Sequence, residues 1–210
     1  TYTFVADALD NNKAADKEQL KHLKDFQKLY KKLLTRRHKR GAIEFDTTET
    51  QICFDENGKI DKIVPRARNE AHRMIEEAML LANVSAADYL ESNAITALYR
   101  NHEHPEEAKL VALRDFLKVF GLMLPGGSEP NPADYSKLIS QVEKRPDAHL
   151  LQTVLLRSMR QANYAPENKG HFGLASKTYT HFTSPIRRYP DLLVHRLLKE
   201  RISQTERPTY

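Results

Sequence analysis

Two prolines five residues apart, Pro185 and Pro190, constrain the fold of this chain more than any other feature. Pro190 lacks the N–H group that a continuous helix needs, so one regular helix cannot run through both positions. Thr183 and Ser184 are natural N-cap residues, and Pro185 suits a first helical turn. We therefore expect a tight turn through Ser184–Tyr189, followed by a helix that begins near Pro190.

Two adjacent arginines, Arg187 and Arg188, lie inside this turn. They would sit beside the exposed N–H groups at the positive end of the helix dipole, where cations are unfavourable unless an anion or a carboxylate neutralises them. Arginine binds phosphate through a planar fork of donors. A nearby acid such as Asp191 could instead pair with the arginines in a structural network. The residues alone leave both interpretations open.

The rest of the chain is typical of an α+β fold that is mostly helical. Apolar residues at three- and four-residue steps, with helix-start and helix-stop signals, predict further helices. Their ranges are Asp16–Arg40 (capped by Gly41), Arg66–Leu90, His104–Gly121 (with Pro105 in the first turn), Pro132–Val142 and Pro146–Arg160. Alternating apolar residues predict a short antiparallel sheet of two or three strands around Ala42–Val64, with Asn57-Gly58 at a hairpin turn.

Composition narrows the class of protein. No run of about 18 apolar residues exists, so no membrane span is predicted, and the first residues, which look extended, do not resemble a signal peptide. The single cysteine, Cys53, cannot form an internal disulfide, and no zinc-binding pattern occurs. The expected compartment is the cytosol. A net charge of +5 suggests an anionic partner without establishing one.

Other residues could carry chemistry, but each has a plainer explanation. Tyr2 and Phe45, on predicted strand faces, are either core residues or platforms for unstacked bases. Glu76, in the middle of a helix, is either a solvated residue or a partner for a sugar hydroxyl. His171 is either structural or a general base. The carboxylates of "FDTTET" and "DENGKID" form no compact cluster for a pair of metal ions.

Several motifs together resemble a known family. "HFGLA" followed by "YTHFTSPIRRYPDLLVHR" closely resembles the signature of the RNB domain, the catalytic domain of the ribonuclease II and ribonuclease R family. "RGAIEF", "AHRMIEEAMLLAN" and "LPGG" are similar to its bacterial ribonuclease R members. The resemblance runs from Tyr2 to about Leu198. It implies a processive 3′-to-5′ exoribonuclease that hydrolyses single-stranded RNA to nucleoside 5′-monophosphates with magnesium held by aspartates.

The resemblance also implies roles for particular residues. Arg187 matches the family's catalytic arginine, which contacts the scissile phosphate, and Arg188 would help to hold the RNA backbone. Tyr2 matches a tyrosine near the terminal nucleotide, and Phe45 matches an aromatic residue that stacks the last bases. Glu76 matches a glutamate that helps to fix the terminal sugar.

One departure from the family is large. The family's metal-binding aspartates lie in a Gly-x4-Asp-x-Asp-Asp-Ala motif, which this sequence lacks, and the flanking cold-shock and S1 domains are also absent. Residues 1–210 are therefore expected to be the C-terminal part of an RNB catalytic domain, with no metal ligand of their own and no activity alone. Magnesium and the missing N-terminal half would belong to the intact enzyme. The alternatives are a non-catalytic RNA-binding module without these aspartates and a helical scaffold whose basic surface is incidental.

Overall fold

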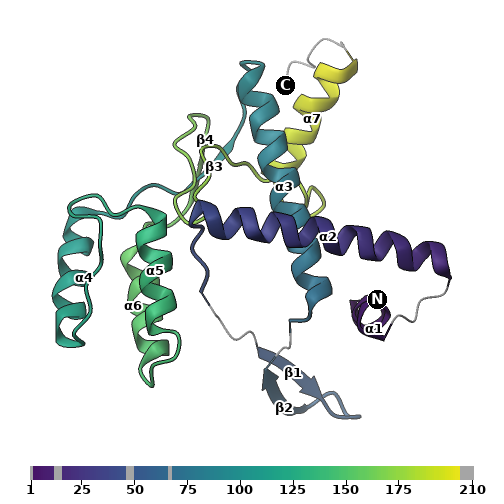
Figure 1. Ribbon diagram of the computed structural model, residues 1–210. Helices are drawn as coiled ribbons and strands as arrows, with labels where there is room; N and C mark the ends of the chain where they lie inside the picture. Colours follow the sequence, from purple (N-terminus) through teal and green to yellow (C-terminus); the bar gives the residue numbers. More distant parts are fainter. Residues whose placement is uncertain (1, 12–15, 46–49, 66–67, 204–210) are drawn as a thin grey trace. The chain divides into compact units, whose positions relative to one another are not determined.

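The computed structural model describes residues 2–11, 16–45, 50–65 and 68–203. These residues form seven helices and two short antiparallel strand pairs (Figure 1), which confirms the α+β prediction. The chain divides into two compact units. The first takes its described residues from Thr1–Leu34 and Phe45–Ala78, and the second from Thr35–Glu44 and Met79–Tyr210.

The N-terminal residues of the first unit are helical, so the expected extended start was wrong. Helix α1 spans Tyr2–Asn11 and buries Ala8 completely. Val5 and Leu9, three residues before and one after Ala8, are half-buried. This spacing places the three side chains on one face of a helix, and it outweighs the extended tendency of the aromatic and β-branched residues near the start. Tyr2 therefore lies on a helix and not on a strand.

A β-hairpin forms at the predicted Asn57-Gly58 turn. Strands β1 (Thr50–Phe54) and β2 (Ile60–Pro65) pair antiparallel. Gly58 has a φ of +75°, a conformation that glycine adopts without steric cost. The Asp55 carboxylate closes the turn because its Oδ1 accepts hydrogen bonds from the backbone N–H groups of Asn57 and Lys59, at 2.9 and 2.8 Å.

The segment before this hairpin, Ala42–Phe45, forms no strand. The N–H group of Ile43 donates to the carbonyl of Gly173 at 2.8 Å, and the N–H group of Ala42 donates to the carbonyl of Arg37 at 3.3 Å. These backbone groups are therefore used by other parts of the second unit. Phe45 is half-buried in an irregular segment, so it too lies off any strand face.

Helix α2 (Lys17–Arg40) ends as predicted at Gly41, whose φ is +79°. A side chain on Gly41 would also collide with Ala133, because its Cβ would lie 2.5 Å from the Ala133 Cβ. Both the backbone conformation and the space beside it thus require glycine at this position.

Three helices of the second unit pack together, since α6 contacts both α4 and α5. Helix α4 spans Glu107–Val119, α5 spans Pro132–Val142 and α6 spans Ala148–Ser158. Asn131 and Asp134 form a capping box that fixes the start of α5 at the predicted residue. Pro105, expected in the first turn of α4, lies instead one residue before the N-cap Glu106.

The last helix, α7 (Tyr189–Ser203), packs against α3 (Glu70–Ser92). The two helices run alongside each other in Figure 1. Ala86, Leu90 and Val194 are buried in their shared core, and the half-buried ring of Phe182 packs against it. This core fixes both flanks of the turn that holds the two arginines.

A second strand pair was not predicted. Strand β3 (Tyr99–Asn101) pairs antiparallel with β4 (Asn163–Ala165), and Arg100 lies directly opposite Tyr164. Each strand has three residues, too few for an alternating pattern to be recognised in a sequence.

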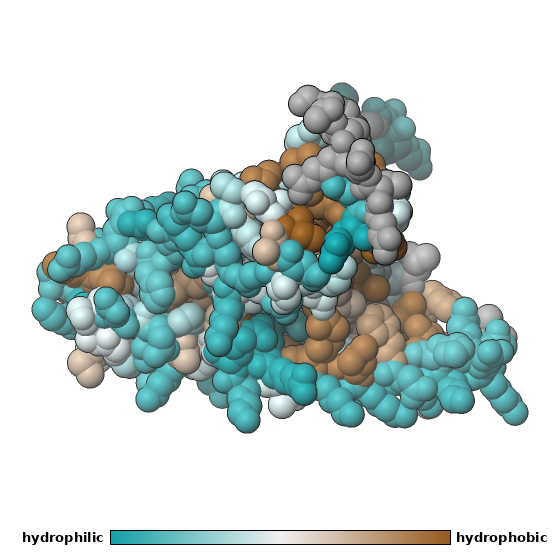
Figure 2. Space-filling model, turned by 90° about the horizontal axis from the view of Figure 1, so that it is seen from above, coloured by the Kyte–Doolittle hydropathy of each residue, from teal (hydrophilic) through white to brown (hydrophobic). Residues whose placement is uncertain are grey.

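On the face that Figure 2 shows, the surface is mostly polar, and hydrophobic residues gather in separate patches. None of the helices in the described ranges is long and apolar enough to cross a membrane.

We expect two adjacent leucines of α6 to contribute differently to the stability of the fold. Leu155 is fully buried, whereas Leu156 is 49% exposed. Leu155→Ala leaves a cavity and should lower the free energy of unfolding by about 2–5 kcal/mol. Leu156→Ala, the matched control, should lower it by less than about 1 kcal/mol. Urea unfolding followed by circular dichroism measures both values, and equal losses would contradict the assigned packing.

Candidate functional site

The two arginines lie in the tight turn that the prolines predicted. The carbonyl oxygen of Ser184 accepts hydrogen bonds from the backbone N–H groups of Arg187 and Arg188, at 3.3 and 3.1 Å. Helix α7 begins directly afterwards at Tyr189. We call residues 184–188 the arginine turn.

A buried carboxylate holds the arginine turn closed. Asp191, in the first turn of α7, is fully buried. Arg188 donates to both of its oxygens, from Nε to Oδ2 at 2.9 Å and from Nη2 to Oδ1 at 2.8 Å. The backbone N–H group of Ser184 also donates to Oδ1, at 2.8 Å. The structural network that the sequence left open therefore exists for Arg188, and the RNA contact predicted for this residue stays a prediction.

Arg187 differs from its neighbour. Its side chain is exposed, and its guanidinium makes no hydrogen bond or ion pair with any residue in the described part of the chain. The carboxylate of Asp191 neutralises one of the two adjacent charges. The turn thus presents a guanidinium whose five N–H donors are available to an anion.

The segment that leads into the turn is tied to α3 by Asn83, which is 3% exposed. The Oδ1 atom of Asn83 accepts hydrogen bonds from the N–H groups of Phe182 and Thr183, at 3.0 and 3.2 Å. Its Nδ2 atom donates to the hydroxyl of Tyr179 at 2.8 Å. Sequence reasoning missed this residue because a single asparagine inside a helical pattern carries no motif.

Two histidines of the second unit, His171 and His181, have strongly lowered pKa values. Burial, with smaller contributions from His102 and Arg100, lowers the pKa of His171 to about 3. Burial and the charge of Arg188 lower the pKa of His181 to about 4. Both rings are therefore neutral at pH 7. His171 accepts a hydrogen bond at Nδ1 from the N–H group of Leu174, at 3.2 Å, a contact that supports the structural role expected for it.

The other predicted site residues belong to the first unit, whereas the arginine turn belongs to the second. Tyr2 stacks on His72 with the ring centroids 4.1 Å apart, and its side chain remains 42% exposed. Glu76, on α3, pairs with Arg68 at 2.6 Å. Phe45 is half-buried. The roles predicted for Tyr2, Phe45 and Glu76 stay predictions.

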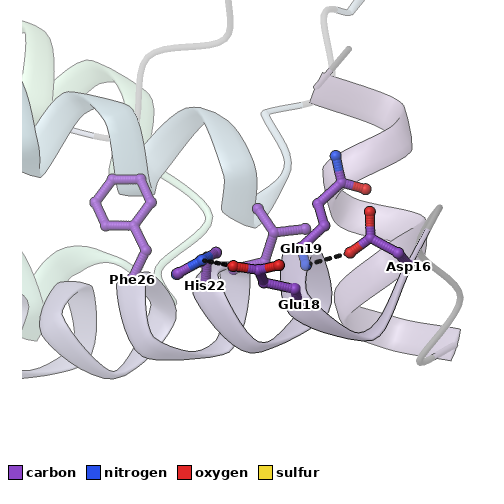
Figure 3. A pocket seen from close by; sticks show the side chains of 6 residues that line it. Asp16, Glu18, Gln19, His22 and Phe26 are labelled. Atoms are coloured by element: carbon purple, nitrogen blue, oxygen red, sulfur yellow. Dashed lines mark hydrogen bonds and ion pairs between the residues drawn. The ribbon is translucent and has the colours of Figure 1, made fainter.

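A pocket lies along the first turns of α2 (Figure 3). None of the predicted site residues lines it. It is lined by Asp16, Glu18, Gln19, His22, Leu23 and Phe26. Its polar groups stabilise the helix itself, because Asp16 accepts from the N–H group of Gln19 at 2.6 Å and Glu18 pairs with His22 at 3.6 Å. We therefore assign the pocket no chemistry.

The described residues do not fit a magnesium centre. They contain no group of three or more His, Cys, Asp or Glu side chains that could hold a metal ion. Asp191, the buried carboxylate beside the candidate phosphate-binding residue, is already bound by Arg188 and by Ser184.

Comparison with known proteins identifies relatives along nearly the whole chain. The profile of the RNB domain matches residues 1–204. Ribonuclease R of Vibrio cholerae is 50% identical over 209 residues, which are 98% of this chain and 26% of that protein. Ribonuclease R of Escherichia coli is 47% identical over 95% of this chain. The chain spans about a quarter of the length of these relatives.

Solved structures agree with the sequence relatives. The apo form of Mycoplasma genitalium RNase R superimposes with a TM-score of 0.91 at 31% identity, over 98% of this chain and 33% of that one. The same protein in complex with ribose-methylated single-stranded RNA gives a TM-score of 0.90.

We predict that Asn83→Ala disrupts the arginine turn. The substitution leaves two partly buried backbone N–H groups without their acceptor, so the free energy of unfolding should fall by about 2–4 kcal/mol. Asn93→Ala, the matched control, removes an asparagine whose Nδ2 donates to the carbonyl of Tyr89 near the exposed end of α3. This control should cost less than about 1 kcal/mol. Chemical unfolding measures both variants, and a loss no larger in Asn83→Ala would contradict the assigned anchor.

Proposed function

Because the chain belongs to the RNB domain family, we propose that it forms part of a processive 3′-to-5′ exoribonuclease. This enzyme would hydrolyse single-stranded RNA to nucleoside 5′-monophosphates. The observation that carries the proposal is the exposed guanidinium of Arg187, held on a turn that Arg188 and Asp191 fix. The relatives named ribonuclease R and the RNA complex of the Mycoplasma genitalium protein support the choice of RNA as substrate.

Arg187 would act on the phosphate group of the scissile bond. Hydrolysis of a phosphodiester builds negative charge on the phosphate oxygens as water attacks phosphorus. A guanidinium held near these oxygens stabilises that charge, and it does so best when little reorganisation is needed during the reaction. The bidentate pair of Arg188 with Asp191 supplies this preorganisation, because it fixes the backbone on which Arg187 stands.

The remaining predicted residues would position the 3′ end of the RNA. We assign Phe45 to stacking of the last bases, Tyr2 to contact with the terminal nucleotide and Glu76 to its sugar hydroxyls. Arg188 would contact the RNA backbone beside the phosphate that Arg187 binds. It would keep its ion pair with Asp191 at the same time.

The proposed enzyme requires magnesium. The described side chains of this chain form no cluster that could hold the ion. In the intact enzyme, residues outside these 210 would bind it, and no step assigned to the present residues depends on it. We also keep the cytosol as the predicted compartment.

A second candidate function is a non-catalytic RNA-binding module. The observation that favours it is the lack of a clustered carboxylate group in the described ranges. Release of mononucleotides from a labelled oligoadenylate by the full-length polypeptide with magnesium would reject this candidate. Binding of the oligoadenylate without any release would favour it over the exoribonuclease.

We predict that Arg187→Ala in the full-length polypeptide lowers turnover by about 10²–10³-fold, because it removes a charge-stabilising donor of the transition state. The affinity for single-stranded RNA should change little. The control is Arg157→Ala, which removes an exposed arginine from the last turn of α6. Single-turnover kinetics with labelled oligoadenylate separate the two effects. A loss that is mainly in affinity would refute the catalytic role of Arg187.

The 210-residue chain alone should release no mononucleotides from the same oligoadenylate in magnesium buffer, because its described residues contain no carboxylate cluster for the metal. The full-length polypeptide, assayed in parallel, is the positive control. Release of mononucleotides by the isolated chain would contradict this prediction.

A further inference from the structure

Three residues that the proposed function does not use lie together in the second unit. Arg100 on β3 faces Tyr164 on β4 across the strand pair, and its guanidinium carbon lies 4.8 Å from the centre of the tyrosine ring. The Tyr164 hydroxyl is 2.6 Å from Nδ1 of His181. We call Arg100, Tyr164 and His181 the Arg100 platform. His181 lies three residues before the arginine turn, so this member of the platform is close to the turn in the sequence.

The platform holds the Arg100 side chain in a defined place. The backbone N–H group of Arg100 donates to the carbonyl of Tyr179 at 2.8 Å, which anchors the strand beneath it. The hydrogen bond to His181 fixes the orientation of the Tyr164 ring, and the guanidinium lies over that ring in a cation–π contact. A guanidinium that stacks through its face keeps its N–H edge available for a planar, bidentate acceptor.

Positive charge around the platform is only partly neutralised. Within the described ranges, Arg100 makes no ion pair with a carboxylate, in contrast to Arg145, which pairs with Asp147 at 2.8 Å. Arg100, Arg187 and Arg188 all lower the pKa of His181, so the three guanidinium groups act on the same site. Asp191 opposes them and already pairs with Arg188. A polyanion is therefore a favourable ligand here.

The platform is accessible to such a ligand. Tyr164 is 36% exposed, and Arg100 and His181 are half-buried. A polyanion with regularly spaced phosphates could offer one phosphate to Arg187 and another to Arg100, because both guanidinium groups act on the same histidine, His181.

We propose that Arg100 binds a second backbone phosphate of single-stranded RNA, next to the phosphate that Arg187 contacts. Tyr164 and His181 act as positioning residues that hold the guanidinium of Arg100. This inference rests on the proposed function, because it takes the RNA substrate from it. It adds a phosphate subsite formed by β3 and β4, outside the residues already assigned.

The salt dependence of RNA binding tests the subsite. In the full-length polypeptide, with divalent ions chelated, fluorescence anisotropy measures the affinity for an oligoadenylate at several salt concentrations. Arg100→Gln should weaken binding by about 5- to 10-fold and reduce the slope of log K against log[salt] by about 0.7, the value for one phosphate contact on a single strand. Arg157→Gln, the matched exposed arginine, should change neither. A wild-type slope in Arg100→Gln would overturn the proposal.

A double-mutant cycle tests the positioning role. Tyr164→Phe keeps the ring beneath Arg100 but removes the hydroxyl that meets His181, so it should weaken binding by about 2- to 3-fold. In the Arg100→Gln background the same change should have no further effect. Fully additive losses would mean that Tyr164 contacts RNA by itself and would overturn its positioning role.

Chemical protection of the wild-type protein provides a test that needs no variant. Phenylglyoxal modifies accessible arginines, and mass spectrometry locates the modified residues. Saturating oligoadenylate should protect Arg100 while Arg157 stays reactive, and inorganic phosphate alone should protect Arg100 much less. Equal protection by phosphate would assign a free-anion site instead. Absence of RNA binding by the wild type would overturn the proposed function itself, whereas binding without protection of Arg100 would overturn this inference alone.

Discussion

The pair between Arg188 and Asp191 is the interaction on which the candidate site depends. A fully buried carboxylate is tolerated only when it is paired and hydrogen-bonded, and Asp191 has Arg188 on both oxygens and the Ser184 N–H group on one of them. Removing one partner of such a pair leaves a buried, uncompensated charge, which costs about 3–5 kcal/mol. The turn, the start of α7 and the placement of Arg187 all follow from this pair.

Two chemically identical neighbours consequently have different roles. Arg188 is used to build the turn, and Arg187 is left exposed on it. Residues of other elements also support the arginine turn. Asn83 binds the irregular segment before the turn, and the hydrogen bond between Tyr164 and His181 orders the side chains beside it. A single flexible arginine on a loop would lose more conformational freedom on binding phosphate, whereas this scaffold has already fixed the backbone.

Sequence patterns predicted the elements whose signals are local. The periodic apolar residues predicted α2 and α5, and Asn57-Gly58 predicted the hairpin turn. The errors arose where tertiary contacts decided the outcome. The backbone of Ile43 is used by the carbonyl of Gly173, so no third strand forms. Strands β3 and β4 pair with each other, and the N–H group of Arg100 also donates to the carbonyl of Tyr179 in the loop beside them. A strand of three residues is too short for the sequence pattern to predict such contacts.

The sequence by itself determined the family, the tight turn between two prolines and the presence of two adjacent arginines, because proline geometry and residue order are local properties. The residues alone left open whether phosphate or carboxylate would bind those arginines, and the family resemblance favoured phosphate. Only the tertiary structure shows that Asp191 pairs with Arg188 and not with Arg187. The pairing depends on which of the two arginine side chains points toward the buried carboxylate. The meeting of Arg100, Tyr164 and His181 was likewise decided by tertiary structure, because residues far apart along the chain become neighbours only through strand pairing and packing.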